Sequence, residues 1–205
     1  QGASDGLPGE AGAGAAGHER AHRQGGALPV LALTQPQDLA VEGLRSLRTS
    51  LQFGMLDSST KAVMLTSAAP ESGKSFVAVN LATVAAQAGQ RVCLIDADLR
   101  RGYLRRYFGL ERDAAGLAEL LSDQITLPEA LRDTQVPGLS VIVAGRFPQA
   151  PSELLLRPAL GQLIARLGED FDLIVVDAPP ILAVTDPLIL ARVTGTSLFV
   201  ARFDR

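Results

Sequence analysis

Five short apolar runs, separated by stretches of helical periodicity, constrain the fold of this chain more than any other feature. The runs are residues 61–67, 91–98, 139–145, 171–179 and 196–202. Residues 92–95 and 173–176 are continuously apolar, as is typical of strands covered on both faces. Helices are predicted at 74–89, 115–133, 151–167 and 186–193. The alternation predicts an α/β fold with a mostly parallel sheet and helices on both faces.

Length and composition favour one globular domain preceded by a tail. Of 205 residues, 47% are hydrophobic and 20% are charged. Residues 1–29 are rich in Gly and Ala and lack periodicity, which predicts a flexible linker, so the domain is expected over residues 30–205. His18 and His22 lie four apart in this linker, but we interpret them as solvated because no third metal ligand accompanies them.

Charge, cysteine content and hydropathy narrow the class of protein further. The net charge of -3 gives no support for a nucleic-acid partner. The single cysteine, Cys93, lies in an apolar run and is interpreted as a buried residue in a reducing compartment. No stretch approaches the roughly 20 apolar residues that span a bilayer.

The stretch TSAAPESGKSFVAVNLA, residues 66–82, has the setting of a phosphate-binding loop: a strand, a short loop and a helix. Loop N–H groups would point at the phosphates, Lys74 would pair with the β and γ oxygens, and Ser75 would ligate Mg²⁺. The pattern G-x-x-x-x-G-K-[ST] is broken at Ala68, where a methyl group is tolerated if φ is negative. A chance Gly-Lys-Ser turn is the alternative interpretation. The predicted nucleotide-binding residues are Ala69, Pro70, Glu71, Ser72, Gly73, Lys74, Ser75 and Phe76.

Carboxylates end two of the predicted strands. Asp96 and Asp98 are two residues apart at the end of one strand, which places both on one face. Asp177 ends another strand at the same edge, where open α/β sheets bind ligands. Three such carboxylates beside a phosphate loop indicate a cation, with Asp177 as its natural partner. As an alternative, they cap helices or form turns; Asp98 directly precedes LRRGY, where it would cap a helix.

A charged helix is predicted to open the domain after an Asp38 cap. Glu42, Arg45 and Arg48 lie three apart on it. Taken alone, this row indicates a solvated face with a weak ion pair.

In combination, TSAAPESGKS, LIDADLRRGY and IVVDAPPILAVTD resemble the bacterial tyrosine kinases of polysaccharide export, especially the single-chain Wzc-type autokinases. The segment AGRFPQAPSELL is similar to the family's proline-rich segment, and EGLRSLRTSLQF to its E-x-x-R-x-x-R oligomerisation helix. The resemblance covers roughly residues 34–205.

The resemblance implies a P-loop NTPase-like fold with a deviant Walker A motif at 68–75 and a Walker B motif at Asp177. It also implies an ATP- and Mg²⁺-dependent tyrosine autokinase that regulates exopolysaccharide polymerisation and export from the cytoplasmic face of the bacterial inner membrane. Its partners would be further copies of the chain in a ring, which phosphorylate each other's tyrosine tails, the membrane export machinery and a cognate tyrosine phosphatase. The resemblance also implies a second Walker A-like motif with Asp96 and Asp98, in which Asp96 is the base or metal partner of the attacking tyrosine hydroxyl. The implied catalytic residues are Lys74, Asp96 and Asp98, the metal ligands are Ser75, Asp96 and Asp177, and the subunit contacts are Glu42, Arg45 and Arg48.

Two further expectations accompany the resemblance. Tyr103 and Tyr107, the only tyrosines, are expected to be structural, with nearby arginines helping to dock an acidic tyrosine tail. Because the chain stops at VARFDR, after the fifth predicted strand, we expect a C-terminally truncated domain whose independent activity is in doubt.

Two alternative functions stay open at this point. A partitioning-type (ParA/MinD-like) switch ATPase shares the deviant loop but has a lysine at its second position, where this chain has Ala69. A catalytically silent regulatory domain of an export complex is disfavoured by the intact Lys74, Ser75 and Asp177.

Overall fold

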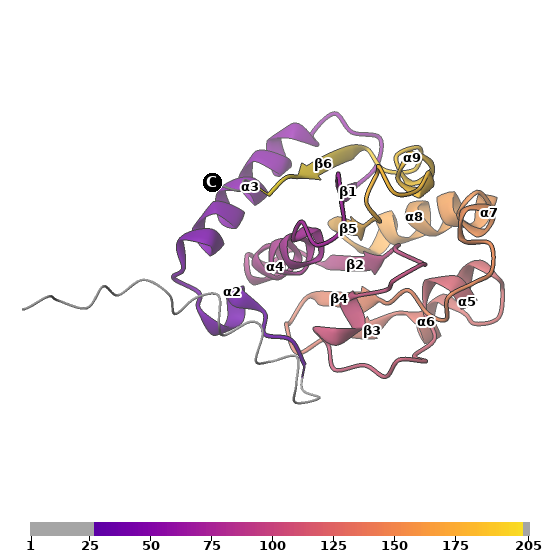
Figure 1. The fold of residues 1–205 in the computed structure, drawn as a ribbon. Coiled ribbons are helices and arrows are strands. Elements are labelled where there is room, and N and C mark those ends of the chain that lie inside the picture. The colour runs from indigo at the N-terminus through magenta and orange to yellow at the C-terminus, as the bar shows by residue number, and fades with distance from the viewer. Residues whose placement is uncertain (1–26, 203–205) are drawn as a thin grey trace, which may run out of the picture.

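A six-stranded sheet in the order β3-β4-β2-β5-β1-β6 organises the computed structural model, which describes residues 27–202 (Figure 1). All neighbouring strands are parallel except β3 and β4, which are antiparallel. The strands are β1 (Ala62–Ser67), β2 (Val92–Asp96), β3 (Arg132–Asp133), β4 (Leu139–Ile142), β5 (Leu173–Asp177) and β6 (Thr196–Val200). The predicted α/β class and all five predicted strands are confirmed; the two-residue edge strand β3 was not predicted.

Helices cover both faces of the sheet (Figure 1). The helices are α2 (Leu31–Thr34), α3 (Leu39–Gly54), α4 (Lys74–Gln87), the 3-10 helix η1 (Leu104–Arg106), α5 (Leu117–Leu121), α6 (Leu127–Ala130), α7 (Pro151–Leu155), α8 (Pro158–Asp170) and α9 (Asp186–Leu190). Helix α3 begins as predicted, because the Asp38 carboxylate accepts a hydrogen bond from the Ala40 N–H. Within residues 27–202, none of the helices combines the length and apolar character that crossing a bilayer requires.

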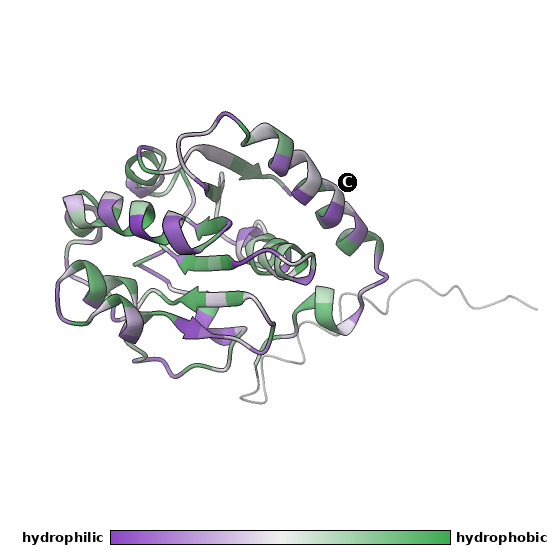
Figure 2. Ribbon diagram, turned by 180° about the vertical axis from the view of Figure 1, so that it is seen from behind, coloured by the Kyte–Doolittle hydropathy of each residue, from purple (hydrophilic) through white to green (hydrophobic). Residues whose placement is uncertain are grey.

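The period of two along each strand divides the core into two layers. On β1, Val63 and Leu65 pack with α2, α3 and α4, whereas Ala62 and Met64 pack with α5 to α9. Figure 2 shows the hydrophobic colouring concentrated on the central strands and on the helix surfaces that face them. Helix α4 is buried along most of its length, so the element that carries Lys74 is fixed at the centre of the domain.

The prediction of a single helix at 115–133 is wrong, since this segment contains two short helices. Helix α5 ends before Asp123, which has a positive φ of 59°, and α6 begins afresh at a capping box formed by Thr126 and Glu129. The predicted helix at 151–167 is two helices, because Pro158 cannot continue α7 and instead occupies the first turn of α8. Local turn signals overrode the apolar periodicity at both places.

The N-terminal end of the described chain is attached to the domain. Leu28 donates its backbone N–H to the Arg106 carbonyl at 2.7 Å and packs against the core. In α2, the Ala32 N–H donates to the fully buried Asn80 Oδ1 at 2.8 Å. The remainder of the predicted linker, including His18 and His22, lies outside the described residues.

Candidate active site

The candidate site lies at the carboxyl edge of three adjacent strands, β2, β5 and β1. Asp96 on β2 is in register with Asp177 on β5, and Asp177 is in turn in register with Leu65 on β1. This is the edge at which parallel α/β sheets bind ligands. The sheet register therefore confirms that Asp96 and Asp177 meet at this edge. Asp98 follows the end of β2, so the predicted placement of Asp96 and Asp98 on one strand face does not apply.

The loop from β1 to α4 has the backbone shape of a phosphate-binding loop. Gly73 has φ = 88° and Glu71 has φ = 62°, so two positions adopt the left-handed conformation. Ala68 is not among the positive-φ residues, which explains how this position accepts a methyl group. Ser67 and Ser72 donate their hydroxyls to the Ala69 carbonyl at 2.9 and 2.7 Å, which ties the loop to the strand.

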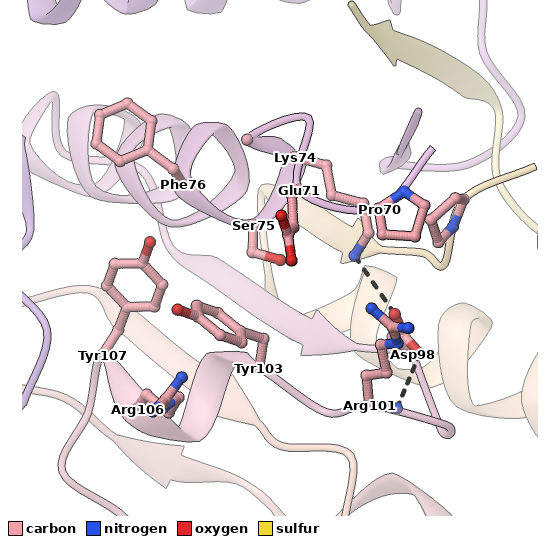
Figure 3. Close-up of a pocket in the computed structure, with 12 residues that line it drawn as sticks. Pro70, Glu71, Lys74, Ser75, Phe76, Asp98, Arg101, Tyr103, Arg106 and Tyr107 are labelled. Carbon is pink, nitrogen blue, oxygen red and sulfur yellow. Dashed lines mark hydrogen bonds and ion pairs between the residues drawn. The ribbon is translucent and has the colours of Figure 1, made fainter. Parts of the chain in front are cut away.

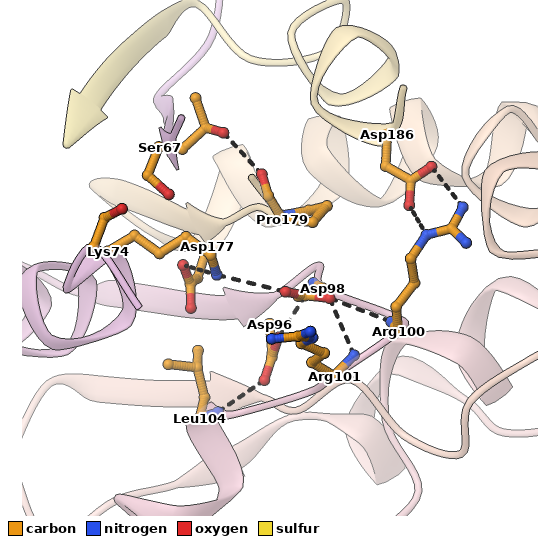
Figure 4. A network of polar contacts seen from close by, with 12 residues as sticks. Ser67, Lys74, Asp96, Asp98, Arg100, Arg101, Leu104, Asp177, Pro179 and Asp186 are labelled. Carbon is orange, nitrogen blue, oxygen red and sulfur yellow. Dashed lines mark hydrogen bonds and ion pairs between the residues drawn. The ribbon is translucent and has the colours of Figure 1, made fainter. Parts of the chain in front are cut away.

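The Lys74 ammonium is the cation of the carboxylate cluster (Figure 4). Its Nζ donates to Asp177 Oδ1 at 3.1 Å and lies 3.6 Å from Asp98 Oδ2. Burial by itself would lower the pKa of Lys74, but the Asp177, Asp98 and Asp96 carboxylates outweigh it, so the pKa is raised and the ammonium stays charged.

Asp96 is turned into the protein. Its residue surface is fully buried, and its two oxygens accept the Leu104 N–H at 2.8 Å and the Asp98 N–H at 3.2 Å. Burial, followed by the charge of Asp177, raises the pKa of Asp96. In this arrangement Asp96 shapes the loop that follows β2, whereas Asp98 reaches the pocket.

Asp177 has the features of a cation ligand. Its Oδ2 is buried and has no hydrogen-bond partner among the described residues. Burial raises the pKa of Asp177, while Lys74 and the Ser75 hydroxyl act in the opposite direction. No group of three metal-ligating side chains exists within residues 27–202. Since Mg²⁺ is commonly held by one or two carboxylates, water and substrate phosphates, an orphaned oxygen beside Ser75 fits that ion.

A pocket of about 480 Å³ opens beside the loop (Figure 3). Six of the eight predicted nucleotide-binding residues line it; Ala69 and Ser72 do not, and act instead through the loop's internal hydrogen bonds. The lining residues are Pro70, Glu71, Gly73, Lys74, Ser75, Phe76, Asp98, Arg101, Tyr103, Arg106, Tyr107 and Pro180.

The basic, aromatic wall of this pocket was only partly anticipated. Tyr103 and Tyr107 form an edge-to-face pair with ring centroids 6.2 Å apart, and the Arg106 guanidinium lies 5.0 Å from the Tyr103 ring centroid. Tyr107 is buried in the core, in line with a structural residue, yet both rings also line the pocket. The sequence RRGYLRRY, residues 100–107 directly after Asp96 and Asp98, was the available signal.

The charged side chains of α3, Glu42, Arg45 and Arg48, make contacts within the chain. Arg45 pairs with Glu42 at 3.0 Å, and both side chains are exposed or half-exposed. Arg48 reaches across to α4 and donates to the Val84 carbonyl at 3.3 Å. Glu42 and Arg45 thus remain at the surface, whereas Arg48 also joins α3 to α4.

Comparison with known proteins places this geometry in a family. The family model described as "AAA domain" matches residues 60–195. The tyrosine-protein kinase ptk of Acinetobacter johnsonii is 46% identical over 178 residues, which cover 87% of this chain and 24% of that protein. The chain thus spans about a quarter of the length of the curated relatives it matches.

Two solved structures agree with this result. The kinase domain of the Escherichia coli tyrosine kinase ETK matches with a TM-score of 0.83 and 45% identity, over 86% of this chain and 69% of that one. The BceF tyrosine kinase domain matches with a TM-score of 0.81 and 48% identity, over 90% of this chain and 73% of that one. This chain belongs to the family of bacterial tyrosine kinase domains.

Proposed function

We propose that this domain transfers the γ-phosphoryl group of ATP to a tyrosine hydroxyl. The observation that carries the proposal is the position of Lys74, which begins the helix after the phosphate loop and contacts carboxylates from two neighbouring strand ends. A cation and acidic groups at the mouth of a phosphate loop are the parts that phosphoryl transfer requires.

The loop residues would hold the nucleotide. Backbone N–H groups of residues 71–75 and the Lys74 ammonium would bind the phosphates, and Phe76 would contact the nucleotide from the pocket wall. Ser75 and Asp177 would hold Mg²⁺, with Asp96 behind them. When bound, the ion offsets the charge of the transferring phosphoryl group.

Asp98 is the stronger candidate to receive the proton of the attacking hydroxyl. Asp98 lines the pocket, whereas Asp96 has no exposed surface and does not line it. In the transfer, the tyrosine oxygen forms a bond to the γ-phosphorus, the bond from that phosphorus to the bridging oxygen of ADP breaks, and the hydroxyl proton passes to Asp98.

The wider setting follows from the family. The tyrosine would belong to the tail of a neighbouring copy in a ring-like homo-oligomer, with Glu42 and Arg45 at the contact and Arg48 supporting their helix. The complex would regulate polysaccharide polymerisation and export at the cytoplasmic face of the bacterial inner membrane, and a cognate tyrosine phosphatase would reverse the reaction. Added phosphate charge would weaken the assembly.

Neither alternative function is favoured. Position 69 is Ala rather than the lysine of the partitioning ATPases, and the ETK and BceF domains at 45% and 48% identity are named tyrosine kinase domains. Lys74, Ser75 and Asp177 are arranged for nucleotide chemistry, which a silent domain does not need.

The test is transfer of label from γ-labelled ATP in the full-length protein with Mg²⁺. We expect label on tyrosine in the wild type, none in Lys74→Met, and retention in Lys61→Met, because Lys61 binds backbone carbonyls of Gly168 and Phe171 outside the site. Label released only as free phosphate would overturn the kinase assignment in favour of an ATPase.

A further inference from the structure

An ion-pair network built around the buried Asp186 carboxylate lies next to the Asp96–Asp98 segment (Figure 4). Arg100 donates to Asp186 through Nε at 3.0 Å and through Nη2 at 3.3 Å. Ser152 donates its hydroxyl to Asp186 Oδ1 at 2.6 Å and accepts a bond from Arg100 Nη2 at 3.0 Å. The Asp186 side chain has no exposed surface, so the charge of Arg100 is what neutralises it.

This network joins three segments that are distant in sequence. Arg100 follows β2, Ser152 is in the first turn of α7, and Asp186 begins α9. Helices α7 and α9 pack against each other at the same end of the sheet (Figure 1). A bidentate pair of an arginine and a buried carboxylate between such elements fixes direction as well as distance.

The loop held by Arg100 is the one that presents Asp98. The backbone N–H groups of Arg100 and Arg101 donate to Asp98 Oδ1 at 3.3 and 3.1 Å, and Asp98 Oδ2 faces Lys74. A continuous series of contacts therefore runs from Asp186 through Arg100 to Asp98.

We infer that Arg100, clamped by Asp186 and Ser152, is a positioning residue that sets the Asp98 carboxylate against the reacting groups. The inference rests on the proposed kinase function. The nucleotide phosphates would be held by residues 71–75. The hydrogen bonds of Arg100, Ser152 and Asp186 do not involve this loop, and the series reaches it through the ion pair of Asp98 with Lys74 at 3.6 Å. We therefore expect loosening of the network to lower the rate of the chemical step more than it weakens nucleotide binding. A misplacement of about 1 Å is sufficient to reduce a rate on the order of a hundredfold.

The chain offers a matched control pair. Arg91 donates to Asp172 through Nη2 at 2.8 Å and Nε at 3.3 Å, in the same bidentate manner, but at the opposite edge of the sheet where β2 and β5 begin. Asp172→Asn therefore removes a comparable arginine partner without touching the Asp98 loop.

The experiment compares Asp186→Asn, Arg100→Lys and Asp172→Asn in the full-length protein. We expect Asp186→Asn and Arg100→Lys to lower kcat for tyrosine phosphorylation about tenfold or more with the KM for ATP within twofold of wild type, and Asp172→Asn to change neither. Lysine keeps the charge of Arg100 but lacks the fork that spans Asp186 and Ser152. Arg100 is partly exposed, so its lysine variant keeps the test valid if Asp186→Asn does not fold.

A second measurement separates this inference from the kinase assignment. Amide hydrogen exchange of the peptide covering residues 97–104 reports the Asp98 loop without any catalysis, and we expect faster exchange in Arg100→Lys but not in Asp172→Asn. Unchanged exchange, or wild-type kcat in both network variants, would overturn the positioning role. Absence of tyrosine label in the wild type would instead overturn the proposed function.

Discussion

Lys74 Nζ lies 3.1 Å from Asp177 Oδ1, and the rest of the Asp177 side chain is buried without another cation among the described residues. This pair links the first residue of α4 to the last residue of β5, so the phosphate loop and the strand-end carboxylates form one electrostatic unit. Burying the Lys74 ammonium or the Asp177 carboxylate alone would cost free energy, and their mutual attraction offsets that cost when both are buried together.

Replacing Lys74 by methionine should therefore destabilise the domain as well as abolish transfer. We expect the free energy of unfolding to fall by about 3 kcal/mol, because the buried carboxylates lose their cation. Adding Asp177→Asn to this variant should recover part of the loss. Urea denaturation of the two single variants and the double variant measures this coupling; strictly additive losses would show that the pair is not one unit.

Gly73 is required for its backbone conformation rather than for space. A Cβ at this position would meet no atom within 4 Å, but φ is 88°. Gly73→Ala should cost about 1–2 kcal/mol and weaken nucleotide binding. Gly43→Ala is the control, since Gly43 lies within α3, also has free space and has no positive φ. Alanine there should raise the free energy of unfolding by as much as about 1 kcal/mol. The midpoint temperature of thermal unfolding should fall in Gly73→Ala and rise in Gly43→Ala.

Much of this site could be predicted because it depends on short segments. Asp96 and Asp177 meet because both end parallel strands, and strand ends are visible as the last residue of an apolar run. The left-handed Glu71 was not predictable, since no residue preference marks it. Nor was the pairing of Arg100 with Asp186, which are 86 positions apart and meet only once the loop after β2 and α9 are placed on the sheet.

The Arg91–Asp172 pair predicts a measurable acid dependence of stability. Hydrogen bonds from the Arg91 side chain and backbone lower the pKa of Asp172 from its ordinary 3.8 to about 2. A lowered folded-state pKa gives stability that is complete above the unfolded pKa and is lost as the pH falls through the folded one. Between about pH 4 and 2 the wild type should therefore lose more unfolding free energy than Asp172→Asn. Parallel curves in acid denaturation would contradict this.

The surface row of α3 leads to a prediction about assembly. The Arg45 side chain is half-exposed and, within the described part of the chain, binds Glu42 and the Pro36 carbonyl, whereas the Arg48 side chain binds a backbone carbonyl of α4. Arg45→Ala should shift the full-length protein toward monomers in sedimentation velocity and leave its thermal stability nearly unchanged. Arg48→Ala should shift the protein toward monomers and also lower its thermal stability. An unchanged oligomer in Arg45→Ala would contradict the subunit contact and support the interpretation of this row as a solvated face.

We expect Asn80 to hold the segment around α2 against α4, the helix that follows the phosphate loop. Its Oδ1 accepts the Ala32 N–H at 2.8 Å and its amide donates to the Phe76 carbonyl, while Ala32 and Asn80 are both fully buried. Asn80→Ala should cost about 2 kcal/mol, because the Ala32 N–H is left buried without an acceptor. The Ala32 amide should then exchange faster with solvent, and residues 27–38 should become sensitive to protease. Gln87→Ala is the control, since the Gln87 side chain is exposed and donates to the Ala32 carbonyl over a longer distance, 3.4 Å. Equal losses in the two variants would mean that α2 is held by apolar packing instead.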